Sequence, residues 1–178
     1  MEHQLENVWS LYVTKTRTTQ AHEKNKEEWE DRLEKIHTFQ TAEDFWRVYN
    51  NIRHSSDMIN ESGDYYLFKG EIMPEWEHSA NVGGGRWIIN SDVSKIDELW
   101  LRTQLSLIGH MYEDYTKFIC GVEMAVRGTR FKIAVWMANG DKETLGKIGK
   151  EIKGFSQASA LTFRWHDEKK AIEVKIVN

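Results

Sequence analysis

Apolar and polar positions along the chain fall into short runs that predict strands separated by turns and helices. Eight runs are rich in aromatic and β-branched residues, which favour extended backbone. They are NVWSLYVT (7–14), KIHTFQ (35–40), YYLFK (65–69), RWIIN (86–90), CGVEMAVR (120–127), RFKIAVWM (130–137), ALTFRWH (160–166) and AIEVKIV (171–177). The polar segment 16–28 has no periodicity, so we expect an exposed loop there.

Three further segments have the pattern of helices. Thr41 followed three residues later by Asp44 resembles an N-cap pair, which opens a helix through about Ile52. Two more helices are expected at about 96–111 and 141–153. Strands in antiparallel succession with three helices between them predict an α+β fold. We expect one curved antiparallel sheet backed by the three helices on its convex face.

The first of these helices has one apolar stripe and one tryptophan outside it. Phe45, Val48, Tyr49 and Ile52 follow the i, i+3, i+4, i+7 rule and are expected to be buried. Trp46 is rotated by about 100° from Phe45 and points towards polar residues. We therefore expect Trp46 to be partly exposed.

The helix expected at 96–111 has two apolar stripes. The first stripe contains Ile96, Leu99, Trp100, Leu107 and Met111, and the second contains Leu101, Leu105 and Ile108. One stripe suffices to dock a helix on a sheet. The second is either a site for a partner's amphipathic segment or a surface buried against another helix. Periodicity alone leaves these two alternatives equally open.

Composition narrows the class of protein. A chain of 178 residues with 40% hydrophobic and 29% charged residues fits one ordinary globular domain, residues 1–178. No apolar run approaches the length of a membrane span and the first residues lack a secretory signal, so a cytoplasmic protein is expected. The single cysteine, Cys120, is expected to be a buried thiol. A net charge of −4 argues against non-specific binding to nucleic acid phosphates.

Motifs for catalysis or metal binding are missing from the sequence. The seven histidines have no metal-ligand spacing, and there is no G-x-S-x-G elbow, P-loop or dinucleotide fingerprint. Gly83, Gly84 and Gly85 precede a strand, which favours a tight turn over a phosphate cradle. We therefore expect neither an enzyme nor a bound metal or cofactor.

The segment MPEWEH (73–78) offers a different chemistry, the recognition of a nucleobase. A tryptophan face stacks on a base with about 1–3 kcal/mol, and a carboxylate accepts hydrogen bonds from a base edge. Trp76 and Glu77 supply both groups. Guanine fits best, because its N1 and N2 are adjacent donors. Methylation of N7 makes the base a cation, which gains about 0.5–2 kcal/mol over a tryptophan face.

Phosphates attached to such a base need cations. AVRGTRFKIAVW (125–136) supplies Arg127, Arg130 and Lys132 close to Trp136. Taken singly, a basic hairpin and a surface Trp-Glu pair more often have no binding role. These two signals indicate a binding site only if further motifs elsewhere in the chain support the same function.

Several motifs follow one another in a fixed order along about residues 3–140. They are NVWSLY, W-x3-L-x2-I-x2-F-x-T-x-EDFW from Trp29 to Trp46, DYYLFK, MPEWEH, GGRW, LWLRTQLSLIG, ICGVEMAVR and KIAVW. So many tryptophans in the same order are hard to obtain by chance. The sequence resembles the eukaryotic translation initiation factor 4E family, which binds the 7-methylguanosine cap of mRNA.

The resemblance implies a cap site whose ligand is 7-methylguanosine, for example as 7-methyl-GTP. Trp29 and Trp76 match the two tryptophans that sandwich the methylated base. Glu77 matches the acid that binds the guanine edge, and Trp136 matches the tryptophan beside the N7-methyl group. No catalytic residue is implied.

The same resemblance implies where the phosphates of the cap lie. Arg86, Arg127 and Lys132 match positions on the phosphate side, either as direct contacts or as support. Arg127 and Lys132 are the better candidates for direct contact. Arg130 lies in the same hairpin and would substitute or assist.

A second surface follows from the resemblance. In this family the helical face receives a short helical motif, Tyr-x4-Leu-hydrophobic, from the large scaffold initiation factor or from inhibitory binding proteins. The residues that match this docking surface are His3, Trp46, Leu101, Leu105, Ile108 and Gly109. Gln4 stands where the family usually has proline, and Arg102 stands where an acidic residue usually follows Trp-Leu. These two departures leave the choice of partner open.

The expected function is therefore binding of capped mRNA by a monomer that recruits the translation initiation scaffold. Two alternatives stay open. The first is a cap-binding translational repressor that does not engage the scaffold, an alternative raised by Gln4 and Arg102. The second is an enzyme acting on capped RNA or nucleotides, against which the missing nucleophile and metal motifs count.

Overall fold

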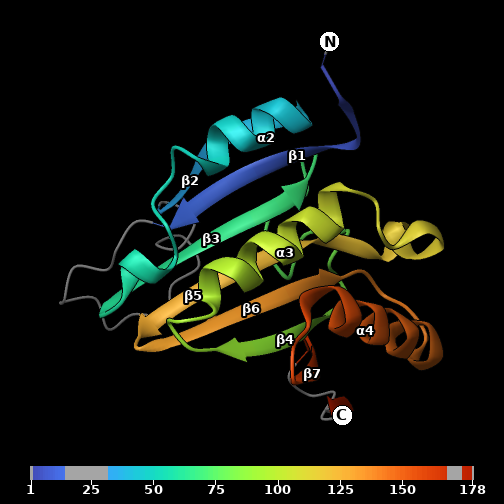
Figure 1. The fold of residues 1–178 in the computed structure, drawn as a ribbon. Coiled ribbons are helices and arrows are strands. Elements are labelled where there is room, and N and C mark those ends of the chain that lie inside the picture. The colour runs from blue at the N-terminus through green and yellow to red at the C-terminus, as the bar shows by residue number, and fades with distance from the viewer. Residues whose placement is uncertain (1, 15–31, 168–173, 178) are drawn as a thin grey trace.

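The computed structural model describes residues 2–14, 32–167 and 174–177. The strands within them form one curved sheet (Figure 1). Eight antiparallel strands follow the order β2-β1-β3-β5-β6-β4-β7-β8. Their bounds are β1 Gln4–Thr14, β2 Leu33–Thr41, β3 Glu61–Lys69, β4 Gly85–Ser91, β5 Ile119–Gly128, β6 Arg130–Met137, β7 Ala160–Trp165 and β8 Val174–Val177. The eight runs identified in the sequence correspond to these strands where the structure describes them, and positions 171–173 of the last run lie outside the described residues.

Three α-helices among the described residues cover one face of the sheet (Figure 1). They are α2 Ala42–Tyr49, α3 Ile96–Ile108 and α4 Lys142–Ser156, and two short 3₁₀ helices span Ser56–Met58 and Glu113–Phe118. The predicted α+β fold with three helices behind one sheet is confirmed. None of the helices in the described part of the chain is long and apolar enough to cross a membrane.

The ends of the helices differ from the prediction where the local backbone decides them. The α2 helix begins as expected, because the Thr41 hydroxyl accepts a hydrogen bond from the Asp44 amide at 3.1 Å. The α3 helix stops at Ile108, since His110 has a positive φ of 56°. Met111, predicted to continue the buried stripe, is consequently outside the helix and 48% exposed. The α4 helix runs on to Ser156, where Gln157 in the left-handed region ends it.

The two faces of the sheet bury different sets of residues. We call the face under the helices the helical face, and its core includes Trp9, Leu67, Trp87, Trp100 and Ile133. We call the opposite face the concave face. Its smaller cluster consists of Tyr12, Tyr66, Phe68, Ile88, Cys120, Ala134 and Trp136. The expected burial of Cys120 is confirmed, and burial raises the pKa of its thiol to about 11.

Close packing of α4 on the sheet fixes the helical face. A Cβ atom at Gly149 would lie 2.4 Å from the Trp87 ring, so only glycine permits this approach. The Trp87 indole also donates a hydrogen bond to the Leu145 carbonyl at 3.1 Å. Apolar side chains of the helices and strands thus occupy the helical face of the sheet. The polar side chains of the central strands therefore point to the opposite, concave face.

Candidate functional site

Strand alternation brings charged and aromatic side chains together on the concave face. Ile133 of β6 belongs to the helical core, so its neighbours Lys132 and Ala134 point the other way, as does Trp136. Arg86 of β4 is the Cα partner of Trp136, and Glu123 of β5 is the partner of Ala134. Three adjacent strands therefore present Arg86, Glu123, Lys132 and Trp136 on one patch.

A buried carboxylate holds this patch together. The Lys132 Nζ lies 2.7 Å from Glu123 Oε1, and Glu123 Oε2 accepts from Arg86 Nη1 at 3.2 Å and from Trp136 Nε1 at 3.0 Å. Burial by itself would raise the pKa of Glu123, but Lys132 and Arg86 together lower it below its usual value. The carboxylate is therefore ionised at neutral pH. We call these four residues the Glu123 cluster.

The ring of Trp136 is packed on several sides. The Arg86 guanidinium lies 5.6 Å from its centroid, and the His166 ring lies 4.4 Å away at an interplanar angle of 39°. Burial, followed by the positive charge of Arg86, lowers the pKa of His166 to about 4. His166 is hence neutral near pH 7 and presents an uncharged ring to the indole. Only 5% of Trp136 is exposed in this structure.

A second buried acid pairs with the other predicted arginine. Arg127 donates from Nη1 to Asp64 Oδ1 at 2.5 Å and from Nη2 to Asp64 Oδ2 at 3.1 Å. Asp64 Oδ2 also accepts hydrogen bonds at 3.3 Å from the hydroxyls of Thr14 and Tyr66. Burial, with the charge of Asp64 as the next cause, raises the pKa of Tyr66 well above 10. The Arg127 guanidinium is thereby fixed at the end of β5.

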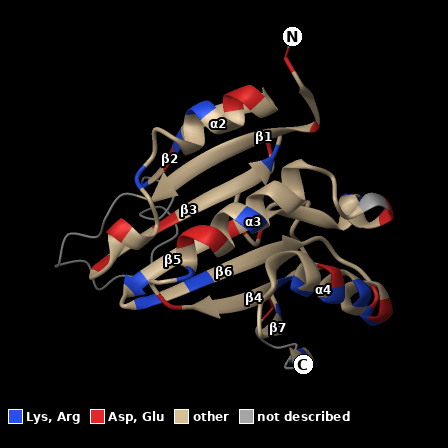
Figure 2. Cartoon of the chain, in the orientation of Figure 1, with Lys and Arg blue, Asp and Glu red and all other residues tan. Residues whose placement is uncertain are grey.

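Arg130 completes the basic part of the concave face. It is the Cα partner of Arg127 at the hairpin between β5 and β6, and its side chain is exposed. Figure 2 shows the basic residues that gather where these two strands join. Like charges directly opposite each other repel. Since Asp64 neutralises Arg127, the pair leaves one outward-facing positive charge at the hairpin.

Trp76 and Glu77 lie in the loop between β3 and β4. Both are exposed, with 53% of Trp76 accessible. The buried Asn81 shapes this loop, because its Nδ2 donates to the carbonyls of Met73 at 3.0 Å and Glu75 at 2.6 Å. The pair Trp76-Glu77 is thus held at the tip of a braced loop.

This loop sits on the same apolar cluster as Trp136. Its residues Ile72, Met73 and Ala80 pack against the concave-face cluster that contains Trp136. Gly84 permits the chain to enter β4 here, since a Cβ atom at this position would lie 2.0 Å from the Met137 carbonyl oxygen. The glycines therefore form a close turn, as predicted, and lead the chain from the Trp76 loop into β4, where Arg86 lies.

Trp29 lies outside the described residues, so its position opposite Trp76 stays a prediction. The structure brings Arg86, Lys132 and Trp136 into direct contact through Glu123. Arg127 and Arg130 lie together at the adjacent hairpin. The predicted base-binding and phosphate-binding residues that the structure describes thus occur on one face of the sheet or on the loop packed against it.

The residues of the second predicted surface lie on or beside the helices. The exposed fraction of Trp46 is 40%, which confirms the expectation from its place outside the α2 stripe. Leu101 and Leu105 are partly buried, whereas Ile108 is 5% exposed. The second stripe of α3 is therefore half covered by the protein itself, and its N-terminal part is accessible.

His3 and Gly109 mark two other parts of this surface. The His3 Nδ1 lies 2.6 Å from Glu43 Oε1, and its amide donates to Glu43 Oε2 at 2.9 Å. These hydrogen bonds lower the pKa of Glu43 to about 2. Gly109 is exposed, and a Cβ atom there would lie 2.8 Å from the Leu105 carbonyl oxygen. The end of α3 is therefore a bare backbone turn that follows the partly buried leucines.

Comparison with known proteins places these features in a family. The family profile named Eukaryotic initiation factor 4E matches residues 4–176. The chain belongs to this family. Eukaryotic translation initiation factor 4E-2 of Solanum lycopersicum is 37% identical over 175 residues, which cover 97% of this chain and 76% of the relative.

Solved structures of other factor 4E family members share the fold. The eIF4E-3 of Ascaris suum in complex with an m7G cap has a TM-score of 0.87 and 31% identity, and the match covers 100% of this chain and 99% of that one. The eIF4E-3 of C. elegans in complex with the 4E-binding protein Mextli and a cap analog has a TM-score of 0.87 and 30% identity, covering 99% and 100%.

Sequence reasoning missed three polar residues of the site in this factor 4E family member. Glu123 and Asp64 are the buried acids that pair with the predicted cations, and His166 covers Trp136. A local signal for the acids exists, because Glu123 and Asp64 each lie beside apolar residues within a strand. His166 follows β7 directly, and the sequence does not reveal that its ring reaches Trp136.

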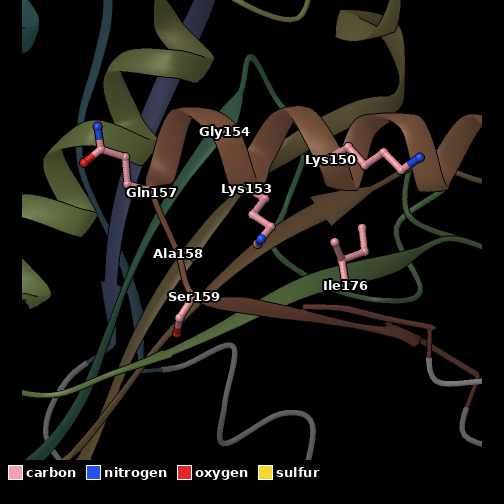
Figure 3. Close-up of a pocket in the computed structure, with 7 residues that line it drawn as sticks. All are labelled: Lys150, Lys153, Gly154, Gln157, Ala158, Ser159 and Ile176. Carbon is pink, nitrogen blue, oxygen red and sulfur yellow. The ribbon is translucent and has the colours of Figure 1, made fainter. Parts of the chain in front are cut away.

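A pocket at the C-terminal end of α4 lies apart from this site. This pocket of about 570 Å³ between α4 and β8 is lined by Lys150, Lys153, Gly154, Gln157, Ala158, Ser159 and Ile176 (Figure 3). Ile176 packs on the helical core, so the pocket opens on the helical side. Among the described residues, no group of three or more histidines, cysteines or acids could hold a metal ion.

Proposed function

We propose that residues 1–178 are a single cap-binding domain that holds the 7-methylguanosine cap of mRNA on the concave face and recruits the translation initiation scaffold on the helical face. Membership of the factor 4E family and the cap-bound relatives support this function. The observation that carries it is the packing of the Trp76 loop on the apolar concave-face cluster that contains Trp136. Trp136 also belongs to the Glu123 cluster, so the loop that carries the exposed Trp76 and Glu77 packs on the same face of the sheet as Arg86 and Lys132.

In the proposed complex, Trp76 and Trp29 stack on the two faces of the methylated base. Each stacking contact is worth about 1–3 kcal/mol. The Glu77 carboxylate accepts hydrogen bonds from N1 and N2 of guanine, which selects guanine over adenine. Trp136 lies beside the N7-methyl group, so its ring has to become accessible from its 5% exposed position.

The phosphates of the cap follow the basic side of the concave face. Arg86 and Lys132 are each about one-third exposed, with 33% and 30% of their side chains accessible. Their outer N–H groups can donate to phosphate oxygens while Glu123 holds the inner ones. Arg127 and Arg130 extend the positive surface to the hairpin between β5 and β6. In the proposed complex the phosphate bridge lies along this positive surface.

We further propose that the protein acts without catalysis, as a cytoplasmic monomer that uses no metal or cofactor. The family is one of initiation factors, and the site in the described residues offers stacking and charge rather than an activated nucleophile. A cap analogue incubated with the protein and divalent metals is expected to remain intact in chromatography. Appearance of a hydrolysed product would contradict this proposal.

Partner recruitment uses the exposed part of the helical face. Trp46 on α2 and the partly buried Leu101 and Leu105 on α3 offer apolar side chains for a short amphipathic helix with the motif Tyr-x4-Leu-hydrophobic. The partner is the scaffold initiation factor or an inhibitory binding protein. The complex of C. elegans eIF4E-3 with the 4E-binding protein Mextli supports this assignment.

The test of cap binding is retention on immobilised 7-methyl-GTP. We expect the protein to be retained, to elute with free 7-methyl-GTP and to stay bound when GTP is added at the same concentration. In solution, 7-methyl-GTP should quench the tryptophan fluorescence far more than GTP does. Equal elution by the two nucleotides would contradict the proposed selectivity for the methylated base.

A further inference from the structure

Glu123 is a buried carboxylate in the middle of the proposed phosphate site. Its side chain is 5% exposed, and it lies in β5 between two apolar residues that face the helical core. Burying an ionised carboxylate is costly unless cations and hydrogen-bond donors compensate it. Arg86, Lys132 and the indole of Trp136 supply all the compensation that the described contacts show.

The same contacts reduce the charge offered to a ligand. Arg86 and Lys132 together carry two positive charges, and Glu123 removes one of them. Asp64 cancels the charge of Arg127 in the same way. With Arg130 included, four cations and two carboxylates leave a net charge of only two on the proposed phosphate side. The site is thus less positive than its four basic residues alone would make it.

The position of Glu123 makes its carboxylate compete with phosphate oxygens for the two cations. Its two oxygens contact Lys132 Nζ at 2.7 Å and Arg86 Nη1 at 3.2 Å, which are distances that a bound phosphate would also adopt. A phosphate that binds these cations has to share them with a fixed negative charge a few ångströms away. The repulsion acts on every phosphorylated ligand, whether or not its base is methylated.

We propose that Glu123 is a specificity-determining residue, the resident anion of the Arg86–Lys132 pair, which limits the affinity gained from phosphates so that the methylated base decides binding. The proposal rests on the proposed cap-binding function. Nucleotides and 5′-triphosphate RNA ends without the methylated base depend on their phosphates for affinity. Glu123 weakens these ligands and capped mRNA by a similar factor, and the capped ligand stays bound because it retains its stacking energy.

The experiment compares three ligands by isothermal titration calorimetry: 7-methylguanosine nucleoside, 7-methyl-GTP and GTP. The quantity of interest is the phosphate gain, defined as the ratio of the Kd of the nucleoside to the Kd of 7-methyl-GTP. Partial unfolding of a variant scales both constants equally and cancels in this ratio. The measurement therefore separates an electrostatic role of Glu123 from a merely structural one.

We expect Glu123→Gln to increase the phosphate gain by about tenfold, because one negative charge close to the phosphates is removed. GTP should bind the variant about tenfold more tightly as well. The nucleoside should bind within about twofold of the wild type, since the amide oxygen can still accept from Trp136 Nε1. The matched control is Glu143→Gln, which removes a carboxylate paired with Lys147 on α4 and should leave all three constants unchanged.

A second pair of variants tests the same proposal in case Glu123→Gln alone folds poorly. Lys132→Gln alone leaves Arg86 neutralised by Glu123 and should lower the phosphate gain. Adding Glu123→Gln to Lys132→Gln restores the wild-type charge of the cluster, leaving Arg86 as its one cation. We expect the double variant to show a phosphate gain about tenfold higher than that of Lys132→Gln.

Three results would overturn the inference. A phosphate gain that falls in Glu123→Gln would mean that the carboxylate orients the cations rather than competing for them. An unchanged gain with equal weakening of all ligands would indicate a structural role only. A wild-type protein that binds 7-methyl-GTP no better than GTP would instead refute the proposed function, and this inference with it.

Discussion

The concave and helical faces of this protein use charge in opposite ways. On the concave face the two acids that pair with the basic residues are buried, with 5% of the Glu123 side chain and 9% of the Asp64 side chain exposed. On the helical face the ion pairs lie at the surface, as for Arg102 and Glu98, whose side chains are 40% and 69% exposed. The acids of one face are fixed by the sheet, and those of the other remain in water.

The buried ion pairs of the concave face suit a small anionic ligand, whereas the exposed ion pairs of the helical face suit a protein partner. Buried charge pairs are held by the surrounding strands, so they present cations in a defined geometry to a small anionic ligand. Exposed ion pairs contribute about 0–1 kcal/mol and rearrange easily. They leave apolar side chains such as Trp46 to provide the affinity for a partner. A rigid polar site and an adaptable apolar surface thus lie on opposite sides of one sheet.

The largest effect should come from removing a buried acid of the concave face. Asp64→Ala leaves Arg127 without its partner and deletes the acceptor of the Tyr66 hydroxyl. Loss of one partner of a buried pair destabilises by about 3–5 kcal/mol, and the lower end applies because 53% of the Arg127 side chain is exposed. Urea unfolding should therefore show a loss of about 3 kcal/mol.

The matched control for Asp64→Ala lies on the helical face. Glu98→Ala removes the partner of Arg102 at the surface of α3 and should lower the free energy of unfolding by less than about 1 kcal/mol. If the two variants lost equal stability, the contrast between buried and exposed pairs would be wrong.

A pH titration of stability should detect the buried His166. Its pKa is about 4 in the folded protein and 6.5 in the unfolded chain, so the unfolded state binds more protons between these values. Stability is then fully present above pH 6.5 and falls as the pH drops towards 4, by roughly 2–3 kcal/mol. Chemical unfolding at several pH values measures the slope.

The variant His166→Phe keeps an aromatic ring beside Trp136 and should remove this slope. Carboxylates with lowered pKa values, such as Glu43 with a pKa of about 2, affect stability only below about pH 4.5. They leave the window between pH 4.5 and 6.5 to His166. A slope that persists in the variant would assign it to another group.

The sequence predicted the fold well because each strand and helix has a local signal. Alternation along 130–137 separates Ile133 from Lys132, and the structure places these two side chains on opposite faces. The helix ends were less predictable. Gly109 and the positive φ of His110 end α3 one turn before Met111, and the apolar periodicity alone does not reveal this.

The sequence revealed which types of residue form the candidate site. It did not reveal which of their side chains contact one another. The tryptophans and cations were recognisable from motifs along the chain. Glu123 was not, because its role depends on Arg86 and Lys132, which lie on two other strands. Strand order and register decide which charges meet, and neither can be obtained from a single strand. An acid between two apolar residues of a strand, as Glu123 between Val122 and Met124, is a local signal that points to such a contact.

A moderate effect is expected at the exposed tip of the concave side. Trp76→Ala removes one stacking face of the proposed cap site and should weaken 7-methyl-GTP binding by about 1–2 kcal/mol. The indole is 53% exposed, so folding stability should change little. Calorimetric titration measures the loss. Unchanged affinity for 7-methyl-GTP would remove Trp76 from the proposed sandwich.

The smallest effect is expected from the corresponding tryptophan of the helical face. Trp46 is 40% exposed on α2, where its ring contacts Phe45 and Tyr49 at centroid distances of 5.0 Å and 5.8 Å. Trp46→Ala should weaken binding of a Tyr-x4-Leu peptide by about 1 kcal/mol, since exposed aromatic residues contribute strongly to such interfaces. Fluorescence anisotropy of a labelled peptide measures the change.

The comparison between the faces becomes sharp when both tryptophan variants are tested with both ligands. Trp46→Ala should retain the wild-type affinity for 7-methyl-GTP, and Trp76→Ala should retain that for the peptide, because the sheet separates the two sites. A loss of cap binding in Trp46→Ala at unchanged stability would show that the two faces are coupled. The sheet would then transmit partner binding to the cap site, and the two faces could not be treated as independent.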